Sequence, residues 1–337
     1  MRKRTKKERR ERYMQARARY EAKRHTKKWK NRKKRKAIRK IKKIRQAKKL
    51  PTSIIAPSNF SLIENAEEVL EYFKKANKLL CKGENVELDV SNVKQLTPPT
   101  LLLLVASIND HDFTQESIVS GNAPKKPELL KLFTESGFYD HVKTNGKFKS
   151  SKENLLNKQV DKIVVSEIVK EASIIGIKHV FNRETPFEPL YEVLLECMSN
   201  TNHHADLKHK GKCRWWLYTY NIPNKKITSY SFMDLGVGIF KSAVVKNYLK
   251  KYTKGTFLYP NIKLVDDLLS GKIQSRIEKD NEIRGKGIPQ IVNNSKRREF
   301  KSFYIITNDV IIDLKTGNRK QLKNGLRGTF FYWEIQN

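Results

Sequence analysis

The apolar positions between residues 189 and 205 recur at helical spacing, and a polar stripe runs beside them. The apolar members follow a proline suited to a first helical turn, and they are Leu190, Val193, Leu194, Cys197 and Met198. Side chains four positions apart share one face of a helix. The stripe with that step is Glu192, Glu196, Asn200 and His204. The pattern predicts a helix over Pro189–Ala205 whose polar face is either solvated or functional.

Two strands are predicted next, over Cys213–Tyr220 and Lys226–Met233, because apolar and β-branched residues dominate both runs and a turn-like Asn-Ile-Pro-Asn separates them. The second run ends in Asp-Leu-Gly-Val-Gly-Ile, residues 234–239. Further glycine motifs read Arg-Gly-Lys-Gly-Ile at 284–288 and Arg-Gly-Thr-Phe-Phe at 327–331. A glycine pair alone is common in loops. The informative feature is therefore the order along the chain of the polar helix stripe and the three glycine motifs.

The first half of the chain alternates between helical and strand patterns. The expected elements are a helix over Leu62–Leu80, a buried strand over Val86–Val90, a proline-opened helix over Leu101–Ile108, a strand near Ser117–Ser120 and a helix over Pro127–Phe138. Such alternation predicts a small α/β layer with some parallel pairing. Polar composition predicts linkers at Pro51–Phe60 and Gly146–Asn157, and Lys158–Gly176 is the expected first helix of the second half.

The four ordered motifs resemble the GHKL ATP-binding fold of gyrase, heat-shock chaperones, histidine kinases and mismatch-repair ATPases. The resemblance spans roughly residues 181–335 and is nearest to the anti-sigma-factor serine kinases, whose first motif also places Glu, Asn and His four residues apart. It implies an α/β sandwich that binds Mg²⁺-ATP. We expect neither the lysine-bearing transducer domain of gyrase nor the phosphoacceptor hairpin of histidine kinases.

The resemblance also implies roles for individual residues. Asp234 would accept a hydrogen bond from the adenine amino group, which a guanine carbonyl could not donate. The glycines that would let the backbone approach the base are Gly236 and Gly238, and Thr329 would add a hydroxyl. Asn200 would coordinate Mg²⁺, a hard cation that prefers oxygen ligands. The backbone that would meet the phosphates at a helix start is Gly285, Lys286 and Gly287.

Glu196 stands where hydrolytic or kinase members of the family keep a general base for attack on the γ-phosphate. The alternative is that Glu196 only orients Asn200 or a lysine. His204 is a polar neighbour of the site or a structural residue. The expected lid, Ile239–Arg284, contains Lys241, Lys246, Lys250, Lys251 and Lys254.

A second, weaker resemblance is to the STAS domain of anti-sigma-factor antagonists, carried by LDVSNVKQLTPPTLLLLVAS and PELLKLFTESGFYDHV. It implies a protein partner or self-association through this part of the chain. In that family a Ser or Thr before the long helix is phosphorylated, and Thr97 or Thr100 falls near that place. Thr97 as an ordinary helix N-cap is the competing interpretation.

Charge is concentrated at the N-terminus. Residues 1–50 contain 27 Lys or Arg and 3 acidic residues, so they carry +24 of the net +35. A segment this basic, helical or disordered, favours a nucleic-acid partner because counterion release rewards each phosphate contact. An acidic protein or membrane surface competes with that interpretation.

Three cysteines without a CxxC pair, and no signal peptide, predict a cytoplasmic protein. The longest apolar run, Leu101–Ala106, is too short to cross a bilayer. A zinc site can be drawn from His203, His204, His209 and Cys213, but the spacing fits no common ligand pattern.

We therefore expect an α/β (α+β) protein: a basic arm at 1–50, a STAS-like domain at 51–150 and a GHKL domain at 151–337. The leading hypothesis is a Mg²⁺-ATP-binding ATPase that acts as a nucleotide-dependent switch and engages nucleic acid through the arm. The alternatives are a serine/threonine kinase of the anti-sigma-factor type and a non-enzymatic nucleic-acid-binding adaptor with a degenerate nucleotide pocket.

Overall fold

Contacts between residues divide the chain into two units, Met1–Thr52 and Ser53–Asn337. The computed structural model describes residues 50–115, 117–144, 146, 148, 154–159, 166–204, 215–242, 245, 249, 259–273 and 287–337, together with Glu21 and Trp29. Glu21 and Trp29 are helical and exposed, and the rest of the basic arm before Leu50 lies outside the described residues. The fold described below is that of the second unit.

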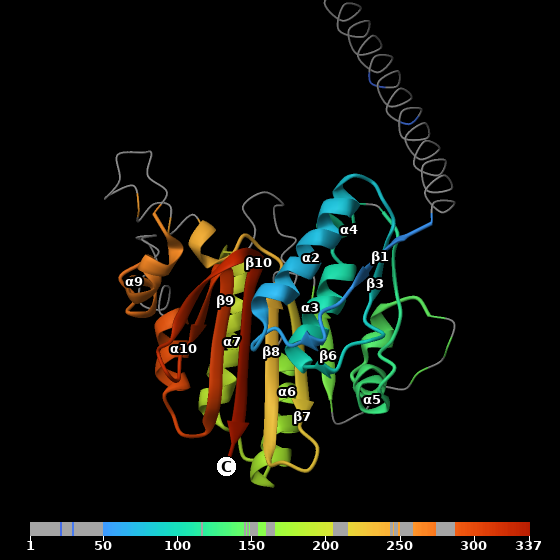
Figure 1. Cartoon of the computed structure of the whole chain (residues 1–337). Coiled ribbons are helices and arrows are strands. Elements are labelled where there is room, and N and C mark those ends of the chain that lie inside the picture. The colour runs from blue at the N-terminus through green and yellow to red at the C-terminus, as the bar shows by residue number, and fades with distance from the viewer. Residues whose placement is uncertain are drawn as a thin grey trace, which may run out of the picture. The chain divides into compact units, whose positions relative to one another are not determined.

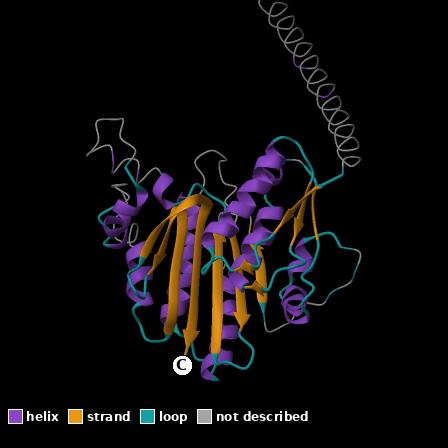
Figure 2. Ribbon diagram, viewed as in Figure 1, coloured by secondary structure: helices purple, strands orange, loops and turns teal. Residues whose placement is uncertain are grey.

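The second unit is built around a five-stranded antiparallel sheet, shown in orange in Figure 2. The strands lie in the order β6-β7-β8-β10-β9, so the last strand in sequence sits between β8 and β9. The strands are β6 (Leu155–Gln159), β7 (Trp215–Asn221), β8 (Ile227–Asp234), β9 (Phe300–Asp313) and β10 (Arg319–Gln336). The predicted strands at Cys213–Tyr220 and Lys226–Met233 are thus confirmed as β7 and β8.

Helices cover both faces of this sheet (Figure 1). One face packs on α6 (Ser166–Phe181), α7 (Glu188–His204) and α10 (Gly287–Ser295). The other packs on α2 (Ala66–Cys81) and α3 (Pro98–Ile108). Along β7, Trp215 and Leu217 join the first core, whereas Trp216 and Tyr218 join the second. Double coverage explains why β7 reads as a continuous apolar run instead of an alternating one.

An aromatic ladder stiffens the face under α6 and α7. Trp333 on β10 stacks on Tyr230 of β8 and on Phe303 of β9, with ring centroids 5.3 and 5.5 Å apart. Both neighbours are its direct cross-strand partners, an arrangement that stabilises sheets. The Tyr230 hydroxyl donates to the carbonyl of Ala172 at 3.0 Å, and it lies where a Cβ on Gly176 would be. Glycine therefore allows α6 to approach the sheet closely.

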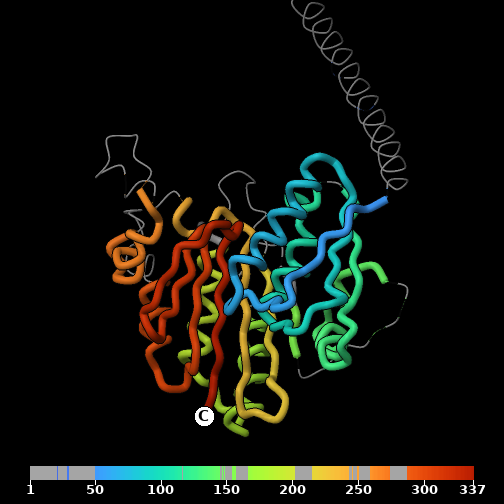
Figure 3. Tube along the Cα trace, viewed as in Figure 1, coloured from blue at the N-terminus to red at the C-terminus, as the bar shows by residue number. Residues whose placement is uncertain are grey.

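The N-terminal part forms a second α/β layer, whose path Figure 3 shows in blue and green. Its sheets have the orders β1-β3-β5 and β2-β4, and the pairs β3·β5 and β2·β4 are parallel, as predicted. Its strands are β1 (Thr52–Ile55), β2 (Asn59–Phe60), β3 (Val86–Asp89), β4 (Gln95–Leu96) and β5 (Val119–Gly121). Besides α2 and α3 it contains α4 (His111–Thr114), α5 (Pro127–Glu135) and the 3-10 turn η1 (Phe138–His141).

Both predicted linkers are partly wrong. Pro51–Phe60 contains β1 and β2, because the short apolar pairs within it find partners in β3 and β4. Leu155–Gln159, at the end of the second expected linker, pairs with β7 as the edge strand β6. Edge strands of this length carry too few residues to show a period. The helix expected at Pro127–Phe138 ends at Glu135, and Gly137, with φ 86°, leads into η1.

The expected helix at Pro189–Ala205 is confirmed as α7, with Ala205 outside the described residues. The expected first helix of this half begins at Ser166 instead of Lys158. The segment expected to form a lid is described at 239–242, 245, 249 and 259–273, where it contains η2 (Ile239–Lys241), η3 (Asn261–Leu264) and α9 (Val265–Leu269). Among its lysines named above, Lys241 alone falls in that part, and it is exposed.

Candidate functional site

The polar stripe of α7 is half-buried against α10. Glu192 accepts a hydrogen bond from Nδ2 of Asn294 at 2.8 Å, which ties the two helices together. Glu196 lies one turn further on and is half-buried. Burial raises the pKa of the Glu196 carboxyl, and the nearby charge of Glu192 raises it further. A carboxyl with a raised pKa is suited to accept a proton near neutral pH. The side chain of His204 lies outside the described residues.

Gly287 begins α10 directly against this stripe. A Cβ at Gly287 would lie 2.7 Å from Oε2 of Glu196 and 3.0 Å from Oδ1 of Asn200. A larger residue would therefore push both side chains away from the helix start. The structure brings together Glu196, Asn200 and Gly287, three of the residues to which the resemblance gives roles, whereas Gly285 and Lys286 lie outside the described residues. The exposed N–H groups and dipole of a helix start favour an anion.

Asn200 presents an amide that the described residues leave unsatisfied. Its Nδ2 is buried and finds no hydrogen-bond partner among them. Such groups are costly unless a ligand, ion or water completes them. An amide oxygen suits Mg²⁺, and the amide N–H suits a phosphate oxygen, so the residue fits the group expected here. Among the described residues, no group of three or more His, Cys, Asp or Glu side chains is placed to hold a metal.

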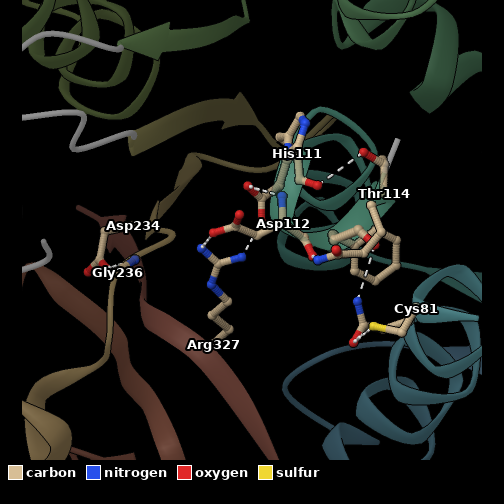
Figure 4. Close-up of polar contacts among 11 residues, drawn as sticks. Cys81, His111, Asp112, Thr114, Asp234, Gly236 and Arg327 are labelled. Carbon is tan, nitrogen blue, oxygen red and sulfur yellow. Dashed lines mark hydrogen bonds and ion pairs between the residues drawn. The ribbon is translucent and has the colours of Figure 1, made fainter. Parts of the chain in front are cut away.

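Asp234 ends β8 and is buried. Its carboxylate accepts from the backbone N–H of Gly236 at 2.8 Å and from the backbone and hydroxyl of Thr329, its cross-strand partner on β10. Burial raises the pKa of Asp234 to about 6, and these hydrogen bonds and the charge of Arg327 oppose the rise. Figure 4 shows Asp234 bent back to Gly236. The Asp234, Gly236 and Thr329 predicted for one site are therefore in contact.

The loop after Asp234 is held by two residues of β9. Oδ1 of Asn308 accepts from the N–H of Phe240 at 3.0 Å, and its Nδ2 donates to the carbonyl of Val237 at 2.9 Å. The hydroxyl of Thr307 accepts from the N–H of Ile239 at 2.9 Å. Gly238 has φ +79°, and a Cβ there would lie within 2.6–2.8 Å of the Asn308 amide. Only glycine fits, because of this backbone conformation and close packing.

Thr307 and Asn308, which hold this loop, were not among the residues predicted from the sequence. The available signal was a Thr-Asn pair inside the otherwise apolar run FYIITNDVII of β9. The left-handed backbone of Asn308, with φ 53°, could not be read from the sequence. Gly236 contributes its N–H to Asp234, a contact that the sequence did not predict.

The two clusters lie on the same face of the sheet. Phe232 belongs to the core under α7, and Asp234 lies two residues later on the same side of β8. Cys197 of α7 is fully buried, and its thiol pKa is raised by burial and then by the charges of Glu196 and Asp234. Cys197 therefore lies close enough to both carboxyl groups to sense them. Both clusters therefore lie on the α7 side of the sheet.

Thr97 and Thr100 of the N-terminal layer lie on the opposite side of the sheet from α7. Thr97 precedes α3 at the N-cap position, but its side chain makes no capping hydrogen bond. Thr100 is fully buried and accepts from the N–H of Leu62 at 2.7 Å. Because α3 packs in the core that excludes α7, neither hydroxyl faces Glu196. The proposed zinc ligands fall outside the part whose side chains are described.

The fold is that of an α+β protein with two polar clusters, one where α7 meets the start of α10 and one where the end of β8 meets β10. No known protein-family model matches the chain, and no curated protein is significantly similar to it. Within the ranges that the structure describes, no helix combines the length and the apolar character needed to cross a bilayer.

Proposed function

We propose that the protein is a Mg²⁺-ATP-binding ATPase of the GHKL type that acts as a nucleotide-dependent switch. One observation carries the proposal: Asn200, whose Nδ2 is an unsatisfied donor among the described residues and whose Oδ1 would meet a cation, and the half-buried Glu196 both meet the glycine that starts α10, on the same sheet face as the buried Asp234. A carboxylate for the purine, an amide for the cation and a helix start for phosphate are the three groups a nucleotide site needs.

The chain's own residues would perform the reaction as follows. Asp234 would accept a hydrogen bond at the base edge, and the Thr329 hydroxyl, whose proton goes to Asp234, would add an acceptor oxygen there. Gly238 keeps the loop after β8 close to the sheet. Asn200 contributes an oxygen to Mg²⁺, which would neutralise phosphate charge when bound. Glu196, with its raised pKa, takes the proton from the attacking water. The backbone at Gly287, with Gly285 and Lys286 before it, holds the phosphates.

Isothermal titration with ATP and Mg²⁺ tests the nucleotide assignment on the wild type and on Asp234→Asn. A matched control is Asp313→Asn, because Asp313 also ends a strand and accepts from an N–H two residues later, Lys315, at 2.9 Å. We expect Asp234→Asn to weaken binding by about 10- to 100-fold, the value of a hydrogen bond to a charged group, and Asp313→Asn to bind normally. Equal affinity in all three proteins, or no binding by the wild type, refutes the proposal.

Transfer of phosphate to protein, the kinase alternative, has a distinct geometric requirement. Thr97 and Thr100 lie across the sheet from Glu196, so a kinase of this fold would act on another chain. Incubation with labelled ATP and phosphosite mapping separates the outcomes. Free phosphate without labelled protein supports the ATPase, whereas a labelled Ser or Thr on a partner supports the kinase.

The nucleic-acid partner is proposed for residues 1–50, whose +24 charge is the motivating observation. We expect binding to duplex or single-stranded nucleic acid to weaken steeply with salt, because each neutralised duplex phosphate contributes about −0.9 to the log–log slope. Deletion of residues 1–50 should abolish it. Binding that survives this deletion contradicts the proposal, and ATP-independent binding without any nucleotide affinity supports the adaptor alternative.

A further inference from the structure

Arg327 occupies an irregular point of β10, immediately before the nucleotide-site residues. The β9–β10 register passes from Leu326↔Asn308 to Thr329↔Thr307, so Arg327 and Gly328 bulge out of the ladder. Gly328 has φ +87°, and a Cβ there would collide with the backbone of Asp234. The conformation of this bulge therefore decides how Thr329 meets Asp234, because pairing between β10 and β8 begins at that residue pair.

The side chain of Arg327 reaches out of the sheet to the N-terminal layer. Its NH1 donates to Oδ2 of Asp110 at 2.5 Å, and its NH2 donates to Oδ2 of Asp112 at 2.6 Å. Asp110 directly precedes α4, and its Oδ1 accepts from the N–H of Asp112. Figure 4 shows the guanidinium between the Asp112 end of α4 and the Asp234–Gly236 turn. One cation thus links the end of α3–α4 to the strand that carries Thr329.

This pair is more than an exposed surface contact. The side chain of Asp110 is 7% exposed, whereas those of Arg327 and Asp112 are each 47% exposed. Exposed ion pairs contribute little, but a buried carboxylate deprived of its cation is costly. The planar guanidinium binds two carboxylates at once, which fixes its direction as well as its charge. The Asp110 contact therefore anchors the bulge.

We propose that Arg327 is a positioning residue for the nucleotide site: held by Asp110 and Asp112, it fixes the bulge that sets Thr329 against Asp234. The proposal rests on the proposed nucleotide function. It makes the α3–α4 end of the N-terminal layer a part of the site, so any partner or modification that displaces α4 changes nucleotide affinity. Such a coupling between distant elements has a typical size of 5- to 150-fold, or about 1–3 kcal/mol.

The electrostatic consequence concerns Asp234. The charge of Arg327 lowers the pKa of Asp234 and so opposes the effect of burial. The other groups that act on Asp234 are the N–H of Gly236 and the backbone and hydroxyl of Thr329 on β10; on α7, the thiol of Cys197 senses the charges of both Asp234 and Glu196. Without Arg327, the pKa of Asp234 would rise further and the carboxylate would protonate closer to neutral pH.

The test measures ATP affinity of the full chain from pH 5.5 to 8.5 by titration calorimetry. We expect Arg327→Ala to weaken binding about tenfold at pH 7.5 and to move the loss of binding at low pH to higher pH. Arg327→Lys keeps the positive charge but cannot bind both carboxylates as the guanidinium does. Its binding should therefore depend on pH as in the wild type, while its ATP affinity stays below that of the wild type. The double variant Asp110→Asn/Asp112→Asn should weaken binding, but its loss of binding at low pH should stay closer to the wild-type pH than that of Arg327→Ala, because the arginine charge remains.

Arg319→Ala is the matched control, since Arg319 also lies on β10 and pairs with an aspartate, Asp266, at 2.7 Å. It should bind ATP like the wild type. Arg327→Ala binding with wild-type affinity and pH profile overturns the proposal. If the wild type binds no ATP, the proposed function fails, but the link between Arg327 and Asp234 can still be tested by NMR of the Asp234 carboxyl. An Asp234 pKa that Arg327→Ala leaves unchanged overturns this link, and a raised Asp234 pKa supports it.

Discussion

A Cβ added to Gly287 would lie 2.7 Å from Oε2 of Glu196, so the start of α10 and the centre of α7 meet so closely that a side chain at Gly287 would displace the Glu196 carboxyl. The close approach brings backbone N–H groups of a helix start to a carboxyl and an amide. In the proposed ATPase this is the place where phosphate, cation and attacking water would meet.

Gly287→Ala should therefore impair function more than folding. The atoms that the new methyl group meets are the ends of two flexible side chains, Glu196 and Asn200, which can move aside. We expect stability within about 1 kcal/mol of the wild type, because alanine favours helices over glycine by a similar amount. Mg²⁺-dependent ATP hydrolysis should fall clearly. Gly317→Ala is the control, because Gly317 has φ +75° and the added Cβ would have no neighbour within 4 Å. This change strains the backbone without displacing a side chain, so ATP hydrolysis should stay at the wild-type rate.

Asp234→Asn should stabilise the nucleotide-free protein above pH 6. The native carboxyl holds its proton up to a pKa of about 6, against 3.8 in the unfolded chain. The stability from this group is therefore fully present below pH 3.8 and lost as the pH rises through about 6. An isosteric amide avoids that loss, so the variant should gain up to about 3 kcal/mol at pH 7.5 and almost nothing at pH 4. Urea unfolding at both pH values checks this; a gain that is the same at both pH values contradicts it.

Glu196→Gln should separate hydrolysis from binding. Removal of the proton acceptor should lower kcat by about 10²- to 10⁴-fold while ATP affinity stays near the wild-type value. Glu192→Gln is the informative companion, because the Glu192 charge helps to raise the Glu196 pKa and glutamine can still accept from Asn294. Glu192→Gln should keep its activity at neutral pH, and the pH at which kcat falls on acidification should be lower than in the wild type. Full activity in Glu196→Gln would assign Glu196 an orienting role instead.

Asn308→Ala should loosen the loop between Asp234 and Phe240. It removes the hydrogen bonds to the N–H of Phe240 and the carbonyl of Val237, which costs about 1–3 kcal/mol for groups left unsatisfied in a buried place. Asn308→Gly also removes them but tolerates the φ of 53°. Thermal unfolding should thus rank the wild type above Asn308→Gly and Asn308→Gly above Asn308→Ala. An Asn308→Ala protein as stable as the wild type would show that these bonds contribute nothing.

The helical spacing of α7 was readable from the sequence because its apolar and polar positions separate cleanly around one axis. The antiparallel hairpin β7–β8 was readable for a similar reason, since a turn of Asn and Pro interrupts two apolar runs. The family likeness then directed attention to Asp234 and Asn200, which the structure places on the same face of the sheet.

Other features depend on partners that are distant in sequence. The strands β1, β2 and β6 are short and gain their pairing from elsewhere, so composition resembled a linker. Asn308 holds a loop some seventy positions earlier through side-chain hydrogen bonds, and Arg327 reaches Asp110 across 217 positions. Local periodicity carries no information on such contacts. The sequence also gave no sign that α2 and α3 would pack on the second face of the main sheet.

That second face has a consequence for signalling. The apolar side chains of α2 and α3 cover this face of the sheet, and α6, α7 and α10 cover the other face. Among the described strands, only the edges of the sheet are therefore open to another molecule. If the proposed ATPase has a partner that responds to bound nucleotide, that partner should therefore touch the protein where β6 or β9 borders the sheet, or at the corner where α4 meets β10.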